Sequence, residues 1–196
     1  MKIIAFIGFP LSGKSTATKV AKELEIPVIV MGDVVRDEVK KRGLGLSDEI
    51  LGKIASELRQ KEGMDTIAKR CIPLIKQAAR EKGIVVVDGI RGIAEVEKFK
   101  KEFGDDFILI YIDAPLEIRH KRALERGRSD DIKTIEELKA RDERELSWGM
   151  GEAIKIANFT IENTDDLKSF KEKIRDLLNQ LARFVEVEIE TTIHPT

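Results

Sequence analysis

Short apolar runs alternate along the chain with longer stretches in which apolar and polar residues recur at helical spacing. Five of the apolar runs are short enough to be buried strands. They are Lys2–Ile7, Val28–Met31, Ile84–Val87, Phe107–Ile112 and Phe159–Ile161. Because strands that alternate with helices form a sheet covered on both faces, the pattern predicts an α/β fold with a five-stranded parallel sheet flanked by helices.

The stretch between the second and third predicted strands has no strand pattern. Its segments Val34–Arg42, Asp48–Lys61 and Asp65–Lys82 carry apolar residues at helical spacing. Ser47 stands directly before acidic residues and is predicted to cap the second helix. We therefore expect residues 34–82 to form a helical insertion that binds an acceptor molecule.

A second helical region follows the fourth predicted strand. Pro115 begins a helix that stops near Gly127, and Thr134 with Glu137 forms a capping box for the next helix. A short linker separates the two helices. Residues 116–146 are therefore predicted to be lid-like helices.

The end of the chain has a different pattern, because apolar and acidic residues alternate from Phe184 to Glu190. Alternation is typical of a half-exposed strand. We expect residues 184–196 to form an extra C-terminal strand and a tail, at a sheet edge or in a homodimer contact. The whole chain, residues 1–196, has the length of a single domain.

A phosphate-binding loop is predicted directly after the first strand. Its sequence fits G-x-x-x-x-G-K-[ST], and a helix is predicted over Thr16–Leu24. In such loops backbone amides cradle the phosphates, the lysine reaches the β and γ groups, and the hydroxyl residue ligates Mg²⁺. Lys14 and Ser15 take these two places. The expected nucleotide-binding residues are Gly8, Phe9, Pro10, Leu11, Ser12, Gly13, Lys14, Ser15 and Thr16.

Asp88 ends the third predicted strand. The carboxyl ends of parallel strands face the ligand crevice, so Asp88 is expected near the phosphate loop. Mg²⁺ at such loops needs an acidic neighbour, which makes Asp88 and Ser15 the candidate metal ligands. The alternative is an aspartate that only caps the turn into Gly89.

Asp33 and Arg36 follow the second predicted strand and lie three residues apart, on one face of a helix. A guanidinium at the crevice can bind an acceptor's phosphate, and a carboxylate can bind or deprotonate a hydroxyl. Asp33 is therefore a candidate for both acceptor binding and catalysis. The alternative is a pair that only stabilises the helix.

Arginines concentrate in the lid-like region, where Arg119, Arg122 and Arg126 share a helix face and Arg128 follows. A planar guanidinium suits phosphate oxygens and the charge that develops during phosphoryl transfer. We expect Arg122, Arg126 and Arg128 to act in catalysis together with Lys14. A solvated face paired with nearby acids is the alternative.

Two further positions allow two interpretations each. Trp148 either packs under the lid or stacks on a base, and packing is the favoured interpretation. Asn163, which follows the fifth predicted strand, either reads an adenine edge or caps the next helix. Capping is the favoured role for Asn163.

Composition narrows the class of protein. Lys and Arg (35) nearly balance Asp and Glu (36), which gives a net charge of −1 and argues against nucleic acid as the main partner. The single cysteine, Cys71, excludes a disulfide framework and a cysteine-rich zinc site. The first apolar stretch is too short to span a membrane. We expect a soluble, cytoplasmic protein with no membrane partner.

Together these segments resemble the P-loop nucleotide and small-molecule kinases. The phosphate loop, Gly32-Asp33-x-x-Arg36, Asp88-Gly89 and the arginine-rich helix before Arg128-Ser129-Asp130-Asp131, with Arg141 beyond, are similar in order to adenylate kinases. The same segments, with Tyr111-Ile112-Asp113-Ala114-Pro115 and Ile161-Glu162-Asn163, also resemble dephospho-coenzyme A kinase.

A closer resemblance lies in Met31–Arg36 and Val87–Gly92, which are similar to an archaeal family often labelled dephospho-CoA kinase-related. The resemblance extends to about Leu181. It implies the three-layer P-loop kinase fold, ATP and Mg²⁺ as cofactors, and a small acceptor. The acceptor-binding residues are then expected to be Asp33, Arg36 and Arg91.

Two departures from the adenylate kinase pattern bear on the acceptor. Met31 stands where adenylate kinases carry a hydroxyl residue, and Ile90 and Arg91 stand where they have an aromatic residue, proline and arginine. These differences weigh against AMP. Asp33 matches the carboxylate that acts on the sugar hydroxyl in dephospho-coenzyme A kinases.

The expected activity is an ATP- and Mg²⁺-dependent transfer of the γ-phosphoryl group to a nucleotide-like acceptor, with a dephospho-CoA-like acceptor among the options. One alternative is a nucleoside monophosphate kinase of the adenylate type. Another is a regulatory or assembly ATPase that uses the terminal strand as its partner surface. A hydroxyl acceptor depends on a base such as Asp33, whereas a phosphate acceptor depends mainly on Arg36.

Overall fold

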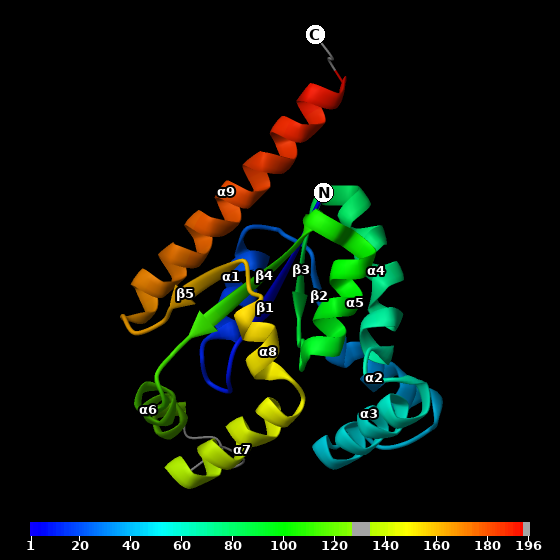
Figure 1. The fold of residues 1–196 in the computed structure, drawn as a ribbon, viewed down its shortest axis with the longest axis vertical. Coiled ribbons are helices and arrows are strands. Elements are labelled where there is room, and N and C mark those ends of the chain that lie inside the picture. The colour runs from blue at the N-terminus through cyan, green and yellow to red at the C-terminus, as the bar shows by residue number, and fades with distance from the viewer. Residues whose placement is uncertain (127–133, 194–196) are drawn as a thin grey trace.

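A five-stranded parallel sheet forms the centre of the protein, whose structure is a computed structural model (Figure 1). The structure describes residues 1–126 and 134–193, except the side chains of residues 48, 49, 126 and 185–193. The strands are β1 (Lys2–Ile7), β2 (Val28–Val30), β3 (Ile84–Asp88), β4 (Phe107–Asp113) and β5 (Phe159–Glu162). Their order, β2-β3-β1-β4-β5, and their parallel pairing confirm the sheet that the sequence predicts.

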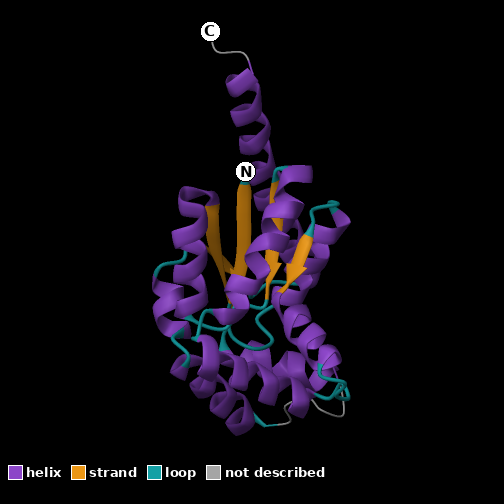
Figure 2. Ribbon diagram, turned by 90° about the vertical axis from the view of Figure 1, so that its right-hand side faces the viewer, coloured by secondary structure: helices purple, strands orange, loops and turns teal. Residues whose placement is uncertain are grey.

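Helices cover both faces of this sheet, and the strands point toward the end where loops gather (Figure 2). The chain leaves β1 toward β2 and β3 on one side and returns to β4 and β5 on the other, which creates a crevice at the carboxyl ends. The helices are α1 (Lys14–Glu23), α2 (Met31–Lys41), α3 (Asp48–Glu62), α4 (Thr66–Lys82), α5 (Ile93–Phe103), α6 (Leu116–Arg126), α7 (Ile135–Ser147), α8 (Met150–Lys155) and α9 (Leu167–Ile193), with a short 3-10 turn η1 (Gly104–Asp106).

Side chains of β1 alternate between two apolar cores. Ile3, Ala5 and Ile7 belong to the core shared with α2, α3, α4, α5 and α8. Ile4 and Phe6 belong to the core shared with α1 and α9. Both cores are buried because β1, at the centre of a parallel sheet, is covered on its two faces.

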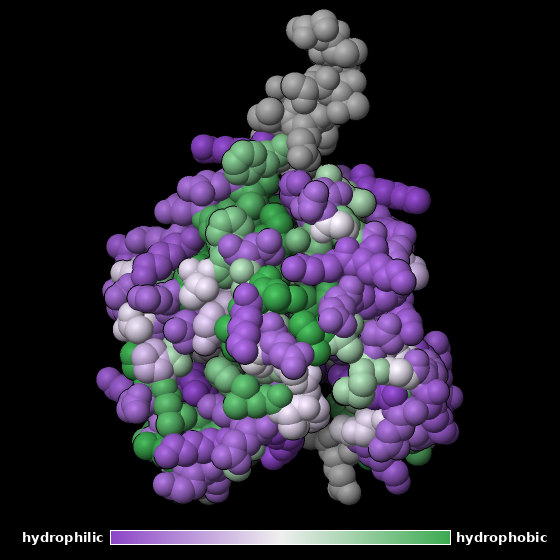
Figure 3. Space-filling view, in the orientation of Figure 1, coloured by the Kyte–Doolittle hydropathy of each residue, from purple (hydrophilic) through white to green (hydrophobic). Residues whose placement is uncertain are grey.

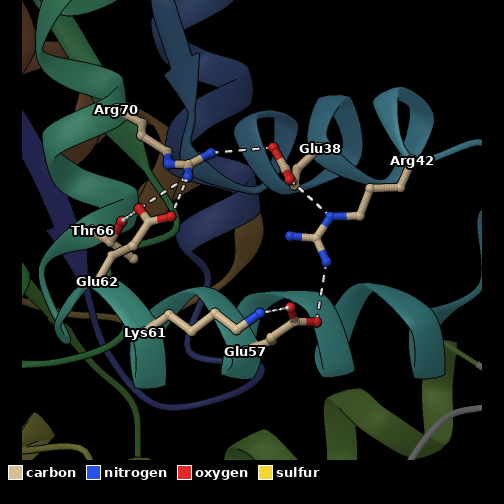
Figure 4. A network of polar contacts seen from close by, with 7 residues as sticks. All are labelled: Glu38, Arg42, Glu57, Lys61, Glu62, Thr66 and Arg70. Atoms are coloured by element: carbon tan, nitrogen blue, oxygen red, sulfur yellow. Dashed lines mark hydrogen bonds and ion pairs between the residues drawn. The ribbon is translucent and has the colours of Figure 1, made fainter.

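The helical insertion consists of α2, α3 and α4, as predicted. Ser47 caps α3, since its hydroxyl accepts the N–H of Ile50 at 3.3 Å. Met31 begins α2 instead of ending β2, and its side chain is buried in the core. Ion pairs link the three helices (Figure 4), and they join Glu38, Arg42, Glu57, Lys61, Glu62 and Arg70, while the hydroxyl of Thr66 donates a hydrogen bond to Glu62.

Helices α6 and α7 lie where the sequence predicts two helices, and their role as a lid stays a prediction. Thr134 and Glu137 form the capping box at the start of α7, where Thr134 Oγ1 accepts the N–H of Glu137 at 3.1 Å. The predicted linker over 127–133 lies outside the described residues. Cys71 is a buried residue of α4 and packs in the core that α4 shares with β1.

The prediction of a C-terminal strand is wrong, because Phe184–Ile193 continues α9 as helix. Phe170, Ile174, Leu178 and Leu181 bury one face of α9 at helical spacing. Once a helix has formed, adding a further residue to it costs little free energy. The segment from Leu167 to Ile193 contains no proline or glycine that would end the helix. Figure 1 shows the end of α9 projecting beyond the sheet.

Polar side chains dominate the face shown in Figure 3, and apolar side chains are visible near its centre and at its lower left. Among the described residues, no helix combines the length and the apolar character that a membrane span requires.

Candidate functional site

The phosphate-binding loop joins the end of β1 to the start of α1, which is the context that the motif requires. Gly8 and Gly13 have φ angles of +159° and +116°. A Cβ on Gly8 would lie 2.5 Å from the carbonyl oxygen of Ile112, and one on Gly13 would collide with the Asn163 amide. Both positions therefore need glycine.

Lys14 begins α1 and turns back over the loop. Its Nζ donates hydrogen bonds to the carbonyl oxygens of Gly8 and Phe9, the latter at 2.8 Å. Burial is the main cause that lowers the pKa of Lys14 to about 8, while the carboxylate of Glu145 acts in the opposite direction. Anionic phosphates near Lys14 would favour its charged form.

Nucleotide affinity should therefore fall as the pH rises above about 8. Lys14 then loses its proton in the free protein, and binding must restore it, so the Kd of an ATP analogue should increase by up to about tenfold per pH unit. Isothermal titration calorimetry from pH 6.5 to 9.5 measures this. Lys14→Arg is the control, since its guanidinium stays charged over this range. A wild-type Kd that does not change with pH would contradict the prediction.

Asn163 and Arg122 hold the phosphate-binding loop in place. Asn163 is buried and its Nδ2 donates to the carbonyl oxygen of Ser12 at 2.7 Å. Arg122 Nη2 donates to Asn163 Oδ1 at 3.0 Å, and its Nη1 donates to the carbonyl oxygens of Leu11 and Ser12, both at 3.4 Å. Asn163 therefore braces the loop, and the predicted capping role is wrong, because Asp166 accepts the N–H groups of Lys168 and Ser169 at the start of α9.

Arg119 is buried, unlike a residue of a solvated face, and connects several elements. Its guanidinium forms two hydrogen bonds with the carboxylate of Asp142 in α7, at 2.9 and 2.6 Å. It also donates to the carbonyl oxygens of Ala114 and Pro10 and lies over the Phe9 ring. Arg119 thus fastens α7 to the phosphate-binding loop.

A first pocket of about 1030 Å³ opens over the phosphate-binding loop. Of the predicted nucleotide-binding residues, Pro10, Leu11, Gly13, Lys14, Ser15 and Thr16 line it, whereas Gly8 and Ser12 are buried and Phe9 packs against the core. Asp88, the other predicted metal ligand, lines the same pocket as Ser15. A hydroxyl and a carboxylate are oxygen donors of the kind that Mg²⁺ prefers, so this pair fits the ion.

A second pocket of about 1150 Å³ lies between the helical insertion and α7. Arginines surround it, and Trp148, which is 38% exposed, forms part of its wall. The arginines are Arg36, Arg59, Arg91, Arg141 and Arg144. Four residues line both pockets, namely Asp88, Arg91, Arg141 and Glu145. Molecules bound in the two pockets would meet at these four residues.

Glu95 of α5 positions two of the arginines. It is buried, and its Oε1 lies 3.2 Å from Arg59 Nη2 while its Oε2 accepts the backbone N–H of Arg91 at 2.7 Å. Burial raises the pKa of Glu95, and the hydrogen bond from Arg91 and the charge of Arg59 oppose that effect. The contact ties α3 to the loop that carries Arg91.

The predicted acceptor-binding residues differ in whether they line a pocket. Arg36 and Arg91 line the second pocket, whereas Asp33 is absent from the lining of either described pocket. The Asp33 carboxylate is 62% exposed and pairs with Arg36 Nη1 at 2.5 Å. This ion pair is the helix-stabilising alternative, and it also orients Arg36.

Two predicted catalytic residues cannot be placed. The side chain of Arg126 and all of Arg128 lie outside the described residues. Conversely, Arg59 and Glu145, which sequence reasoning did not select, line the second pocket together with Arg141 and Arg144, two arginines that follow the lid arginines in the sequence. The available signal was the spacing of three of these residues. Arg144 and Glu145 follow Arg141 by three and four residues, so the three side chains share one face of a helix.

Solved structures with similar folds include several kinases. TT1252 from Thermus thermophilus is 20% identical with a TM-score of 0.65, over 92% of this chain and 97% of that chain. A gluconokinase from Sinorhizobium meliloti 1021 is 13% identical with a TM-score of 0.55, over 95% and 97%. A shikimate kinase from Acinetobacter baumannii is 16% identical with a TM-score of 0.52, over 96% and 94%. These similarities show the P-loop kinase fold.

Closer relatives carry the name UPF0200 and not dephospho-CoA kinase. A UPF0200/UPF0201 protein of Archaeoglobus fulgidus is 64% identical over all of this chain, which spans 61% of that relative. A UPF0200 protein of Methanosarcina acetivorans is 57% identical, over 91% of this chain and 95% of the relative. Residues 7–139 match the AAA domain family. The chain therefore belongs to the AAA domain family and to the UPF0200 family.

Proposed function

We propose that the protein is an ATP- and Mg²⁺-dependent small-molecule kinase that moves the γ-phosphoryl group to a nucleotide-like acceptor, with a dephospho-CoA-like acceptor among the options. The observation that carries the proposal is the shared wall of the two pockets, formed by Asp88, Arg91, Arg141 and Glu145. Direct transfer needs a donor and an acceptor side by side, and this wall would bring them together.

The first pocket would take the donor nucleotide. Backbone amides of the phosphate-binding loop and the N-terminus of α1 would bind the phosphates, and Lys14 would leave its loop carbonyls to reach the β and γ groups. Ser15 and Asp88 would hold Mg²⁺, which supplies neutralising charge to the β- and γ-phosphate oxygens.

The arginines would have different roles in phosphoryl transfer, according to their positions. Arg91 and Arg141, on the shared wall, can neutralise the transferring group. Arg122 would position the phosphate-binding loop, to which it is hydrogen-bonded. We propose that Arg126 and Arg128 complete the lid, as their place in the sequence suggests.

The second pocket would take the acceptor. Arg36, oriented by Asp33, would bind an anionic group of the acceptor, and the partly exposed ring of Trp148 offers a surface for stacking. The pocket's arginines favour an acceptor over the regulatory or assembly ATPase, whose proposed partner surface at Phe184–Glu190 is helix and not strand. A nucleoside monophosphate kinase also uses such arginines and remains the second candidate.

A transfer assay with labelled ATP tests the proposal. Nucleosides, nucleoside monophosphates and dephospho-coenzyme A would be offered as acceptors with Mg²⁺ present, and labelled product would be separated by chromatography. At least one acceptor should become labelled faster than water takes up the phosphate. Hydrolysis alone, with every acceptor unlabelled, would instead favour the regulatory ATPase.

Asp88→Asn should weaken the dependence on Mg²⁺. The loss of a carboxylate near Ser15 is expected to raise the Mg²⁺ concentration at half-maximal rate by about tenfold or more. The Mg²⁺ titration of the rate at saturating ATP measures this. Asp113→Asn is a matched control, since Asp113 ends β4, which β1 separates from β3, and lines neither described pocket. Equal titration curves for both variants would contradict the metal role of Asp88.

A further inference from the structure

Glu145 is a buried carboxylate with an unsatisfied oxygen. Its side chain is 4% exposed, and its Oε1 lies 3.7 Å from Arg91 Nη1. Its Oε2 has no hydrogen-bond partner among the described residues. Buried polar atoms in folded proteins are nearly always hydrogen-bonded, so an unpartnered carboxylate oxygen indicates a place for a missing donor.

The location of Glu145 connects this oxygen to both pockets. Glu145 lies in the last turn of α7 and lines the first and the second pocket. Lys14, whose amine would reach the γ-phosphate, lines the first pocket together with Glu145, and the negative charge of Glu145 opposes the burial that lowers the pKa of Lys14. A donor bound at Oε2 would therefore stand beside the phosphoryl group in transfer.

We propose that Glu145 is the residue that binds and deprotonates the attacking group, and that this group is a hydroxyl. The inference rests on the proposed kinase function and extends it to a substrate class, an alcohol that carries a separate anionic group. The hydroxyl would donate its hydrogen bond to Glu145 Oε2.

The transfer step then balances with the groups already named. The hydroxyl oxygen attacks the γ-phosphorus of ATP, its proton passes to the Glu145 carboxylate, and the bond from the γ-phosphorus to the bridging oxygen breaks. ADP leaves with the electron pair of that bond. The product is a phosphate monoester, and the proton later passes from Glu145 to water.

A phosphate as attacking group fits this position poorly. Two anions in a buried site repel each other, so an acceptor phosphate beside Glu145 would carry a large electrostatic cost. Arg36, Arg59 and Arg144 line the second pocket and not the first. They suit an anionic group elsewhere on the same acceptor.

Asp33, the base expected from the sequence, has the opposite surroundings. It is exposed, its carboxylate already has Arg36 as a partner, and it is not part of either pocket lining. Glu145 is buried, has a free oxygen and lines both pockets. The two residues therefore give distinct predictions for the same assay.

The test compares Glu145→Gln with the wild type, using Mg·ATP with water as the first acceptor and the alcohols dephospho-coenzyme A, shikimate and gluconate as further acceptors. We expect Glu145→Gln to lower kcat by about 100-fold or more while the Kd of a non-hydrolysable ATP analogue changes little. Glu145→Asp should restore part of the rate. Glu143→Gln is the matched control, an exposed glutamate two positions away in α7, and should retain the wild-type rate.

The products of the wild-type protein give a readout that needs no variant. ³¹P NMR distinguishes a phosphate monoester, formed from an alcohol, from the anhydride that a nucleoside monophosphate would yield. We expect monoester. A preference for monophosphates, a Glu145→Gln rate close to the wild type, or a weaker ATP-analogue Kd that accounts for the loss would each overturn the role of Glu145.

The proposed function and this inference fail in different ways. If an acceptor is phosphorylated but Asp33→Asn, and not Glu145→Gln, removes the activity, the kinase proposal stands and the role of Glu145 is overturned. If no acceptor is phosphorylated while ATP is hydrolysed, the kinase proposal fails and the substrate class fails with it.

Discussion

Lys14→Ala should abolish phosphoryl transfer, with a fall in turnover of about 1,000-fold or more. The Lys14 amine is the cation held over the loop at its junction with α1, and its hydrogen bonds to Gly8 and Phe9 carbonyls can be exchanged for phosphate oxygens. Alanine also leaves those two carbonyls without their donor. The effect should therefore appear in turnover and, to a smaller degree, in nucleotide affinity.

Steady-state rates of ADP release, with the Kd of a non-hydrolysable ATP analogue, separate the two effects of Lys14→Ala. Lys22→Ala is the control, because Lys22 is an exposed lysine in the last turn of the same helix. Turnover within about tenfold of the wild type would mean that the phosphate-binding loop is not the transfer site.

Arg119→Met should destabilise the protein by about 3 kcal/mol or more, because it leaves Asp142 as a poorly solvated charge without its partner. The side chains of Arg119 and Asp142 are 5% and 15% exposed. The same change removes donors to the Ala114 and Pro10 carbonyl oxygens. Urea unfolding of the variant and the wild type gives the difference in free energy.

Two further variants test whether the loss of stability comes from the ion pair. Lys168→Met breaks an exposed pair with Glu172 and should change the free energy of unfolding by no more than about 0.5 kcal/mol. The double variant Arg119→Met with Asp142→Leu should recover part of the loss, since no charge is then left unpaired. Equal losses in the single and double variants would show that the ion pair is not the cause.

Local patterns account for the elements and motifs that the sequence predicts. The strand β1 and the phosphate-binding loop are contiguous, and the capping box of Thr134 depends on residues only three positions apart. The prediction of a strand is wrong at Phe184–Ile193 for the opposite reason. There the alternating pattern is local, but a helix already held by Phe170 and its neighbours extends through it.

The remaining site residues depend on contacts between distant segments. Arg59 becomes a pocket residue because Glu95, on another helix, holds it. Glu145 looks like any acidic residue on a helix until the fold buries it beside Arg91. Conversely, Arg119 looks like a phosphate ligand until Asp142 is seen to occupy its guanidinium. One sequence contains no signal for such pairings.

The shared wall of the two pockets has a thermodynamic consequence. Because Asp88, Arg91, Arg141 and Glu145 line both cavities, a ligand in one changes the electrostatic surroundings of the other. Linkage requires that any factor by which the nucleotide alters acceptor affinity equals the factor by which the acceptor alters nucleotide affinity. Binding of the two substrates should thus be cooperative in a reciprocal way, and a single molecule that joins a nucleotide to an acceptor should gain affinity from occupying both sites at once.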